Sequence, residues 1–236
     1  MRTDERTSRR ARIRIFVRVG CFGILIPAVI LLGVTVFRDR VYNWISLCVA
    51  LLACLPFFLS FERGRTNTGR VVILAVMVAL SVLGRSLFAG IPFFKPVTAM
   101  VVIAGIYLGA ECGFLCGALS ALLSNMLFGQ GPWTPFQMLS WGVIGLLAAL
   151  LAKPLKKSRL LLCLFGIFAG FLFSMGMDVW TTFSLDGFFR LSRYLALTVN
   201  ALPVTVTYAV SNVVFLLLLA RPIGEKLARV ITKYGI

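Results

Sequence analysis

The side chains that could do chemistry in this sequence are few. It has no histidine and only eight acidic residues, of which Asp178 alone lies well inside an apolar run. Proton-transfer catalysis and metal binding both need several such groups close together. The chain also lacks a G-x-x-x-x-G-K-[ST] loop for ATP phosphates. We therefore predict no catalytic residue, no metal site and no resident cofactor, and we interpret the six cysteines as small buried hydrophobic residues.

Hydrogen-bonding and aromatic side chains instead gather near the ends of apolar runs. The densest group is Gly129–Gln137, an uncharged segment whose glycines and prolines exclude a continuous helix. Such a rigid connector is suited to touching a ligand, although a proline-stiffened turn with an interfacial tryptophan is the alternative. The candidate substrate-binding residues, which fall at one predicted depth, are Arg85, Asn125, Gln130, Trp133, Gln137, Asp178, Trp180 and Asn200.

Some of these residues also have a plainer interpretation. Asp178 inside a membrane should pair with a cation or line a wet cavity, and an ion pair with Arg85 would satisfy it. Trp133 and Trp180 could belong to an aromatic belt at the membrane surface. Their common depth, on different predicted helices, favours a pocket with aromatic walls and a few polar anchors.

The elements that must position these residues are membrane spans. The chain is 60% hydrophobic, has a mean hydropathy of +0.97 and is 14% charged, whereas soluble domains have about 25% charged residues. The net charge of +16 comes from Lys and Arg clustered between apolar runs, which indicates contact with anionic lipid and not with nucleic acid. The apolar runs are 16–37, 42–61, 71–90, 97–110, 113–128, 138–152, 160–183 and 194–220.

The distribution of positive charge decides the number of spans. Residues 97–129 are too long for one ordinary span and short for two. With two short helices joined near Gly109–Gly113, 18 of the 24 Lys and Arg residues fall on the side of the N-terminus and 6 on the other side. One span would move two basic clusters outward, against the positive-inside rule.

We therefore predict an all-α integral membrane protein of the cell membrane with eight spans and both termini in the cytoplasm. Residues 1–15 form a basic tail and 16–61 two extra N-terminal transmembrane helices. Residues 70–220 form a compact six-helix core whose glycines and alanines allow close helix contacts, and 221–236 form a cytoplasmic interfacial helix.

Several segments resemble the S-components of energy-coupling factor (ECF) vitamin transporters, which are substrate-binding membrane subunits. The most specific match is Gly129–Gln137. The other matching segments are Ala75–Ala79, Gly84–Pro92, Lys95–Thr98 and Ser120–Asn125. The resemblance covers about 150 residues, from Arg70 to Ala220, as the six-helix core, and the two extra N-terminal spans depart from it.

The resemblance implies a subunit that captures a vitamin in an outward-facing pocket and has no ATPase activity of its own. Its partners would be a transmembrane coupling protein and two cytoplasmic ATPases. Ala75 and Ala79 would dock on the coupling protein, although small residues four apart also serve internal helix packing. Within the family, the Gly129–Gln137 block is most similar to the branch associated with cobalamin uptake.

Other classes of protein fit the sequence less well. An S-component for another vitamin or micronutrient is the nearest alternative. A lipid-modifying membrane enzyme would need a cluster of acids or a nucleophile with a base, and neither is present. A membrane anchor or assembly protein would bind no ligand. A transporter working alone would favour an internal repeat and an ion-coupling site, and the sequence has neither.

Overall fold

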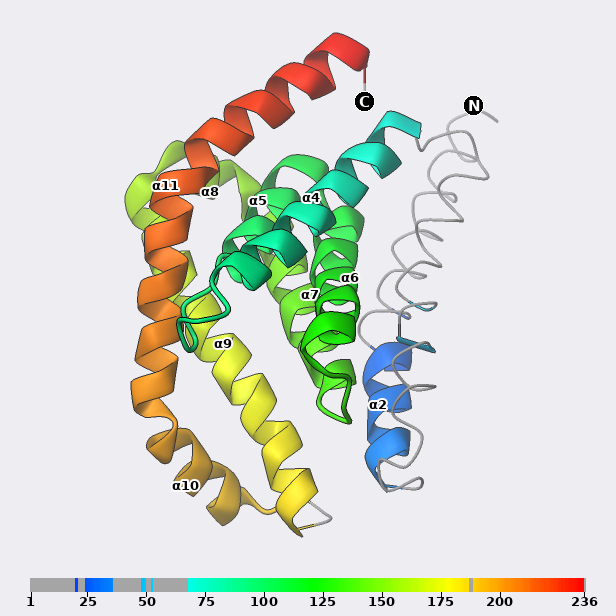
Figure 1. Ribbon diagram of the computed structural model, residues 1–236, viewed down its shortest axis with the longest axis vertical. Coiled ribbons are helices and arrows are strands. Elements are labelled where there is room, and N and C mark those ends of the chain that lie inside the picture. Colours follow the sequence, from blue (N-terminus) through cyan, green and yellow to red (C-terminus); the bar gives the residue numbers. More distant parts are fainter. Residues whose placement is uncertain are drawn as a thin grey trace, which may run out of the picture.

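The computed structural model describes residues 20, 24–35, 48, 49, 52, 68–186 and 189–235, and its regular elements there are helices (Figure 1). They are α2 (Ile26–Thr35), α4 (Thr68–Leu87), α5 (Val97–Leu108), α6 (Ala110–Phe128), α7 (Thr134–Leu150), α8 (Ala152–Lys157), α9 (Arg159–Asp186), α10 (Leu191–Asn200) and α11 (Leu202–Tyr234).

Four of these helices are long and apolar enough to cross a membrane, and they are α4, α6, α9 and α11. Two shorter apolar helices, α5 and α7, complete a bundle of six. The predicted all-helical membrane fold is thus confirmed. The first two predicted spans, 16–37 and 42–61, lie mostly outside the described residues. The eight-span count and the cytoplasmic position of the termini stay predictions.

Helix α5 forms the centre of the bundle, in contact with α4, α6, α7 and α11 (Figure 1). Its residues are apolar on every side, and all but Tyr107 are buried. A helix that is hydrophobic all round needs such surroundings. Helix α7 approaches very closely, because a Cβ added at Gly105 would lie 2.2 Å from the carbonyl oxygen of Gly145. The predicted role of glycines in close packing is realised at this crossing.

A tight turn at Gly109 separates α5 from α6. Gly109 has φ 90° and ψ 179°, in a region that side chains rarely allow, and its N–H still donates to the carbonyl oxygen of Gly105. The Arg70 guanidinium donates to the carbonyl oxygen of Leu108, so α4 supplies a cation to the end of α5. The structure confirms the turn between two helices inferred from the charge distribution. Only α5 is short, however, because α6 is long enough to cross a membrane.

The last predicted span differs from the structure. Residues 194–220 were expected to form one helix, but α10 ends at Asn200 and α11 begins at Leu202. Pro203 lies in the first turn of α11, where its missing N–H costs nothing and its ring prevents α10 from continuing. Helix α11 then runs through Pro222 to Tyr234, so residues 221–234 continue this helix and do not form a separate one.

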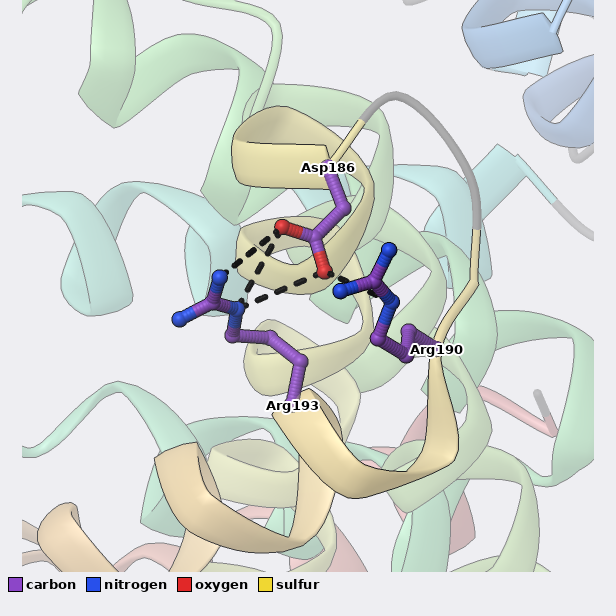
Figure 2. A network of polar contacts seen from close by, with 3 residues as sticks. All are labelled: Asp186, Arg190 and Arg193. Atoms are coloured by element: carbon purple, nitrogen blue, oxygen red, sulfur yellow. Dashed lines mark hydrogen bonds and ion pairs between the residues drawn. The ribbon is translucent and has the colours of Figure 1, made fainter.

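A cluster of charged side chains joins α9 to α10 (Figure 2). Asp186, the last residue of α9, lies 3.2 Å from Arg193 Nη2 and 3.7 Å from Arg190 Nε. The Arg193 Nε also donates to both carboxylate oxygens at 3.3 Å. One acid thus holds two arginines at this corner.

Candidate binding site

A chain of hydrogen bonds connects the ends of α4, α6 and α7. Arg85, near the end of α4, donates from Nη1 to Ser124 Oγ and, at 2.8 Å, to Asn125 Oδ1 on α6. Asn125 Nδ2 donates in turn to Gln137 Oε1 at 2.8 Å and to Thr134 Oγ1 at 2.9 Å, both on α7. Ser124, Asn125 and Thr134 are almost fully buried. Buried polar groups linked in this way hold one another in a single arrangement.

The connector between α6 and α7 extends this network. Gln130 accepts a hydrogen bond from Thr134 Oγ1 at 2.9 Å and donates to the carbonyl oxygen of Leu122 at 2.9 Å. The Trp133 ring packs over Gly131, where an added Cβ would lie 2.3 Å from it, and the Trp133 side chain is 38% exposed. Gln130 and Trp133 thus shape the connector itself, while Gln137 faces inward from the start of α7.

A cavity of about 280 Å³ lies beside the network, between α4, α5, α7, α9, α11 and the connector that follows α4. Gln137 and Arg85 belong to both the network and the cavity wall. The lining residues are Arg85, Pro92, Phe93, Lys95, Val97, Thr98, Gln137, Trp141, Phe173, Tyr208 and Asn212.

Aromatic rings form much of the cavity wall. Trp141 and Phe173 stack with ring centroids 4.6 Å apart and planes 20° apart. Tyr208 meets Phe173 edge-on at 5.2 Å, and Trp141 Nε1 donates to Thr98 Oγ1 at 3.2 Å. These rings are held before any ligand arrives. A flat ring system bound here would find faces and edges in fixed positions.

The connector after α4 contributes two residues to the wall. Phe93 has φ 60°, which is uncommon for a residue with a bulky side chain, and its ring lies 5.7 Å from that of Tyr208. Lys95 is anchored by its backbone, whose N–H donates to Ser211 Oγ at 2.9 Å and whose carbonyl oxygen accepts from the same hydroxyl at 3.1 Å. Helix α11 therefore fixes where the Lys95 side chain begins.

The structure brings together only part of the predicted set. Arg85, Asn125, Gln130 and Gln137 share one network. Trp180, on α9, packs against Phe136 at the start of α7, with ring centroids 5.6 Å apart.

Trp133 lies on the connector outside the cavity lining, and the remaining two predicted residues lie elsewhere. Asp178 is 8% exposed, lies outside the cavity lining, and has one carboxylate oxygen without a hydrogen-bond partner in the described chain. It forms no ion pair with Arg85, which contacts Ser124 and Asn125 instead. Asn200 is exposed at the end of α10 because the helix breaks there.

The predicted docking residues lie on the outer face of α4. Ala75 and Ala79 are exposed, as are Val72, Val76 and Leu80 beside them, so the small side chains do not serve packing within the bundle. Helix α2 contacts α7. The described residues of the extra N-terminal segment do not cover Ala75 or Ala79, which are exposed.

Sequence reasoning missed most of the cavity wall. It did not name Lys95, Trp141 or Asn212 as a binding residue, although Lys95 begins one of the segments that resemble the family and two further signals were available. Trp141 follows Gln137 by four residues and so shares its helix face, and Asn212 is an amide within a long apolar run. Asn212 Nδ2 donates to the carbonyl oxygen of Gly166 at 3.1 Å, which ties α11 to α9 beside the cavity.

Comparison with known families decides the class of protein. The family model described as "ECF-type riboflavin transporter, S component" matches residues 65–229, which is more than two thirds of the chain. The chain belongs to this family. No curated protein and no solved structure matches it. The match includes the whole cavity wall and the six helices of the bundle, except for the last residues of α11.

Membership confirms the S-component class inferred from the sequence. It supports a vitamin-specific binding subunit of an ECF transporter, which is a multi-pass membrane protein and not a member of an enzyme family. The family model names riboflavin, and nothing in the match supports the predicted cobalamin branch.

Proposed function

We propose that this S component captures a vitamin with a flat heteroaromatic ring system, with a flavin as the leading candidate. The observation that carries the proposal is the cavity walled by the Trp141–Phe173 stack and the Tyr208 ring. Gln137 supplies an amide nitrogen that no hydrogen bond among the described residues uses, so it is available to a ring carbonyl. Its amide oxygen is held by Asn125, which orients that nitrogen.

The size of the cavity favours a flavin over cobalamin. Pockets that bury drug-sized ligands have volumes from about 300 Å³ upward. A cavity of about 280 Å³ lies just below the lower end of that range and suits one three-ring system. Cobalamin has a corrin ring and a nucleotide tail and is several times larger, so it would need the connector after α4 to move far outward. The name of the family model agrees with the smaller ligand.

The proposed direction of capture is from outside the cell. The cavity lies at the end of the bundle where α4 ends and α5 and α7 begin. The basic clusters at 153–159 and 221–233 lie at the other end, which the positive-inside rule assigns to the cytoplasm. A ligand would thus enter the cavity from the outer surface.

Release would depend on partners that supply the energy. The family implies an ECF module with a transmembrane coupling protein and two ATPases. We propose that the exposed face of α4 around Ala75 and Ala79 docks on the coupling protein, since small side chains let another helix approach closely.

Calorimetry of the purified chain against riboflavin, cobalamin and a panel of small vitamins tests the ligand. We expect one-to-one binding of riboflavin and none of cobalamin. Tight binding of cobalamin would reject the flavin and restore the cobalamin branch. If no vitamin bound, the chain would have to be considered a membrane anchor.

Ala75→Leu and Ala79→Leu test the docking face. Both variants should bind ligand normally and lose uptake in cells that contain the ECF module. Ala196→Leu, at an exposed alanine of α10, is the matched control and should transport normally. Normal uptake by both α4 variants would place the docking surface elsewhere.

A further inference from the structure

The candidate cavity contains two cations and no acid. Arg85 and Lys95 both line it, and none of its other lining residues is an aspartate or glutamate. Among the described ion pairs, neither cation has a carboxylate partner. A positive charge taken out of water without a counter-ion is costly, more so within a membrane. This cost falls mainly on Arg85, which is the more buried of the two cations, so Arg85 is expected to have a function that offsets it.

Arg85 is held in place while three of its five N–H donors stay open. Its Nη1 donates to Ser124 and Asn125. Its guanidinium carbon also lies 5.0 Å from the centre of the Phe128 ring and 5.7 Å from that of Trp141. No hydrogen bond among the described residues uses Nε or Nη2. A rigid guanidinium with free N–H donors fits the oxygen atoms of a carboxylate or phosphate.

Lys95 places a second cation against the same space. Its ammonium group donates to the carbonyl oxygens of Phe88 at 3.2 Å and Ala89 at 3.5 Å, so one of its three donors is left. Partial burial and, after it, the charge of Arg85 lower the pKa of Lys95 below its ordinary value. The two cations thus repel each other, and an anion between them would relieve that repulsion.

Acids elsewhere in the core do not neutralise this pair. Asp178 is buried but pairs with neither cation, and one of its carboxylate oxygens is unpartnered in the described chain. Asp186 is paired with the arginines of the α9–α10 corner. We therefore expect a bound ligand to supply the negative charge that Arg85 and Lys95 lack.

We propose that the natural ligand of this cavity carries a phosphate or carboxylate group, which Arg85 and Lys95 bind while its ring lies against Trp141 and Phe173. This inference rests on the proposed function and narrows it from flavins in general to anionic ones. Flavin mononucleotide is riboflavin with a phosphate added, so the two compounds form a matched pair of probes.

The experiment titrates the purified full-length chain with each flavin in phosphate-free buffer and follows quenching of flavin fluorescence. We expect flavin mononucleotide to bind at least about tenfold more tightly than riboflavin. Lys95→Gln should remove most of this difference, whereas Lys95→Arg should preserve it. Lys156→Gln, which removes a cation from the opposite end of the bundle, is the control and should change neither affinity.

Arg85→Gln provides a second test. Because the affinities for flavin mononucleotide and riboflavin are measured on the same variant, their ratio can be interpreted even if the hydrogen bonds to Ser124 and Asn125 are lost. The ratio should fall toward one. Riboflavin binding as tightly as flavin mononucleotide to the unmodified chain would overturn the inference and leave the proposed function intact. A preference that persisted unchanged in both Lys95→Gln and Arg85→Gln would also overturn it.

Binding of neither flavin would reject the flavin ligand, an outcome distinct from equal binding. The vitamin panel then decides, because binding of a neutral vitamin would overturn the inference and binding of an anionic one would support it. If no vitamin bound, the proposed function and this inference would both be rejected.

Discussion

Two clusters of paired cations in this S component differ in their counter-charge. At the corner between α9 and α10, Arg190 and Arg193 share the carboxylate of Asp186 (Figure 2). In the cavity, Arg85 and Lys95 share no acid. The corner is satisfied within the protein and is exposed to solvent, with 52% of the Arg190 side chain and 47% of that of Arg193 accessible.

This difference teaches how to separate structural charge from functional charge. An exposed pair with its own counter-ion contributes little, about 0–1 kcal/mol, and needs no ligand to explain it. A partly buried cation without a counter-ion is costly to keep. The corner therefore serves the connection of two helices, and this contrast supports the proposal that the cavity binds an anionic ligand.

The largest effect is expected for Arg85→Gln. This change removes a charge from the cavity and a donor to both Ser124 and Asn125. Loss of one partner from a partly buried charge pair costs several kcal/mol, so affinity for flavin mononucleotide should fall at least about a hundredfold in calorimetry. A loss of less than about threefold would show that Arg85 has only a structural role, like the arginines of the corner.

The next largest effect on ligand affinity is expected for a change in the aromatic wall of the cavity. Trp141→Ala removes one ring of the stack and should weaken binding of either flavin by about tenfold to a hundredfold, since stacking of a base on an aromatic ring contributes about 1–3 kcal/mol. Trp141→Phe, which keeps a ring and loses the hydrogen bond to Thr98, should retain most of the affinity. If fluorescence quenching gave the alanine variant the same flavin affinity as the unmodified chain, the Trp141 ring would not belong to the binding site.

Two neighbouring residues of the network should differ from each other. Gln137→Ala removes a lining amide and should weaken ligand binding several-fold, as expected for one hydrogen bond of about 1 kcal/mol. Trp133→Ala, at a residue that is 38% exposed and outside the lining, should have little effect on affinity. The reverse order in parallel titrations would place the ligand on the connector and not in the cavity.

The smallest effect is expected at the corner. Asp186→Asn leaves both arginines largely exposed to solvent, so the free energy of unfolding should fall by less than about 1 kcal/mol and ligand affinity should not change. Thermal unfolding in detergent and a flavin titration on the same sample measure the two quantities. A tenfold loss of flavin affinity would mean that the corner and the cavity are coupled.

The sequence predicted those parts of the fold that depend on local pattern and charge. The hairpin at Gly109 followed from the asymmetry of Lys and Arg, and the shared network of Arg85, Asn125 and Gln137 followed from their common depth. The break before α11 was missed because Pro203 was read as part of an apolar run, although a proline there can begin a helix.

The cavity wall could be predicted less well than the network. Tyr208 and Phe173 meet across α11 and α9, and which aromatic residues of two long helices meet depends on how these helices cross. Apolar pattern alone does not set that crossing. Asp178 was expected to pair with a cation or to line a wet cavity, but it forms no ion pair with Arg85, whose Nη1 donates to Ser124 and Asn125 on α6.

The most direct test of this account is a structure of the purified chain with flavin mononucleotide bound. We predict the flavin ring against Trp141 and Phe173 and the phosphate between Arg85 and Lys95. A flavin bound instead in the basic cavity of about 370 Å³ at the other end of the bundle, which Lys156, Lys157, Arg159 and Arg221 line, would contradict the account.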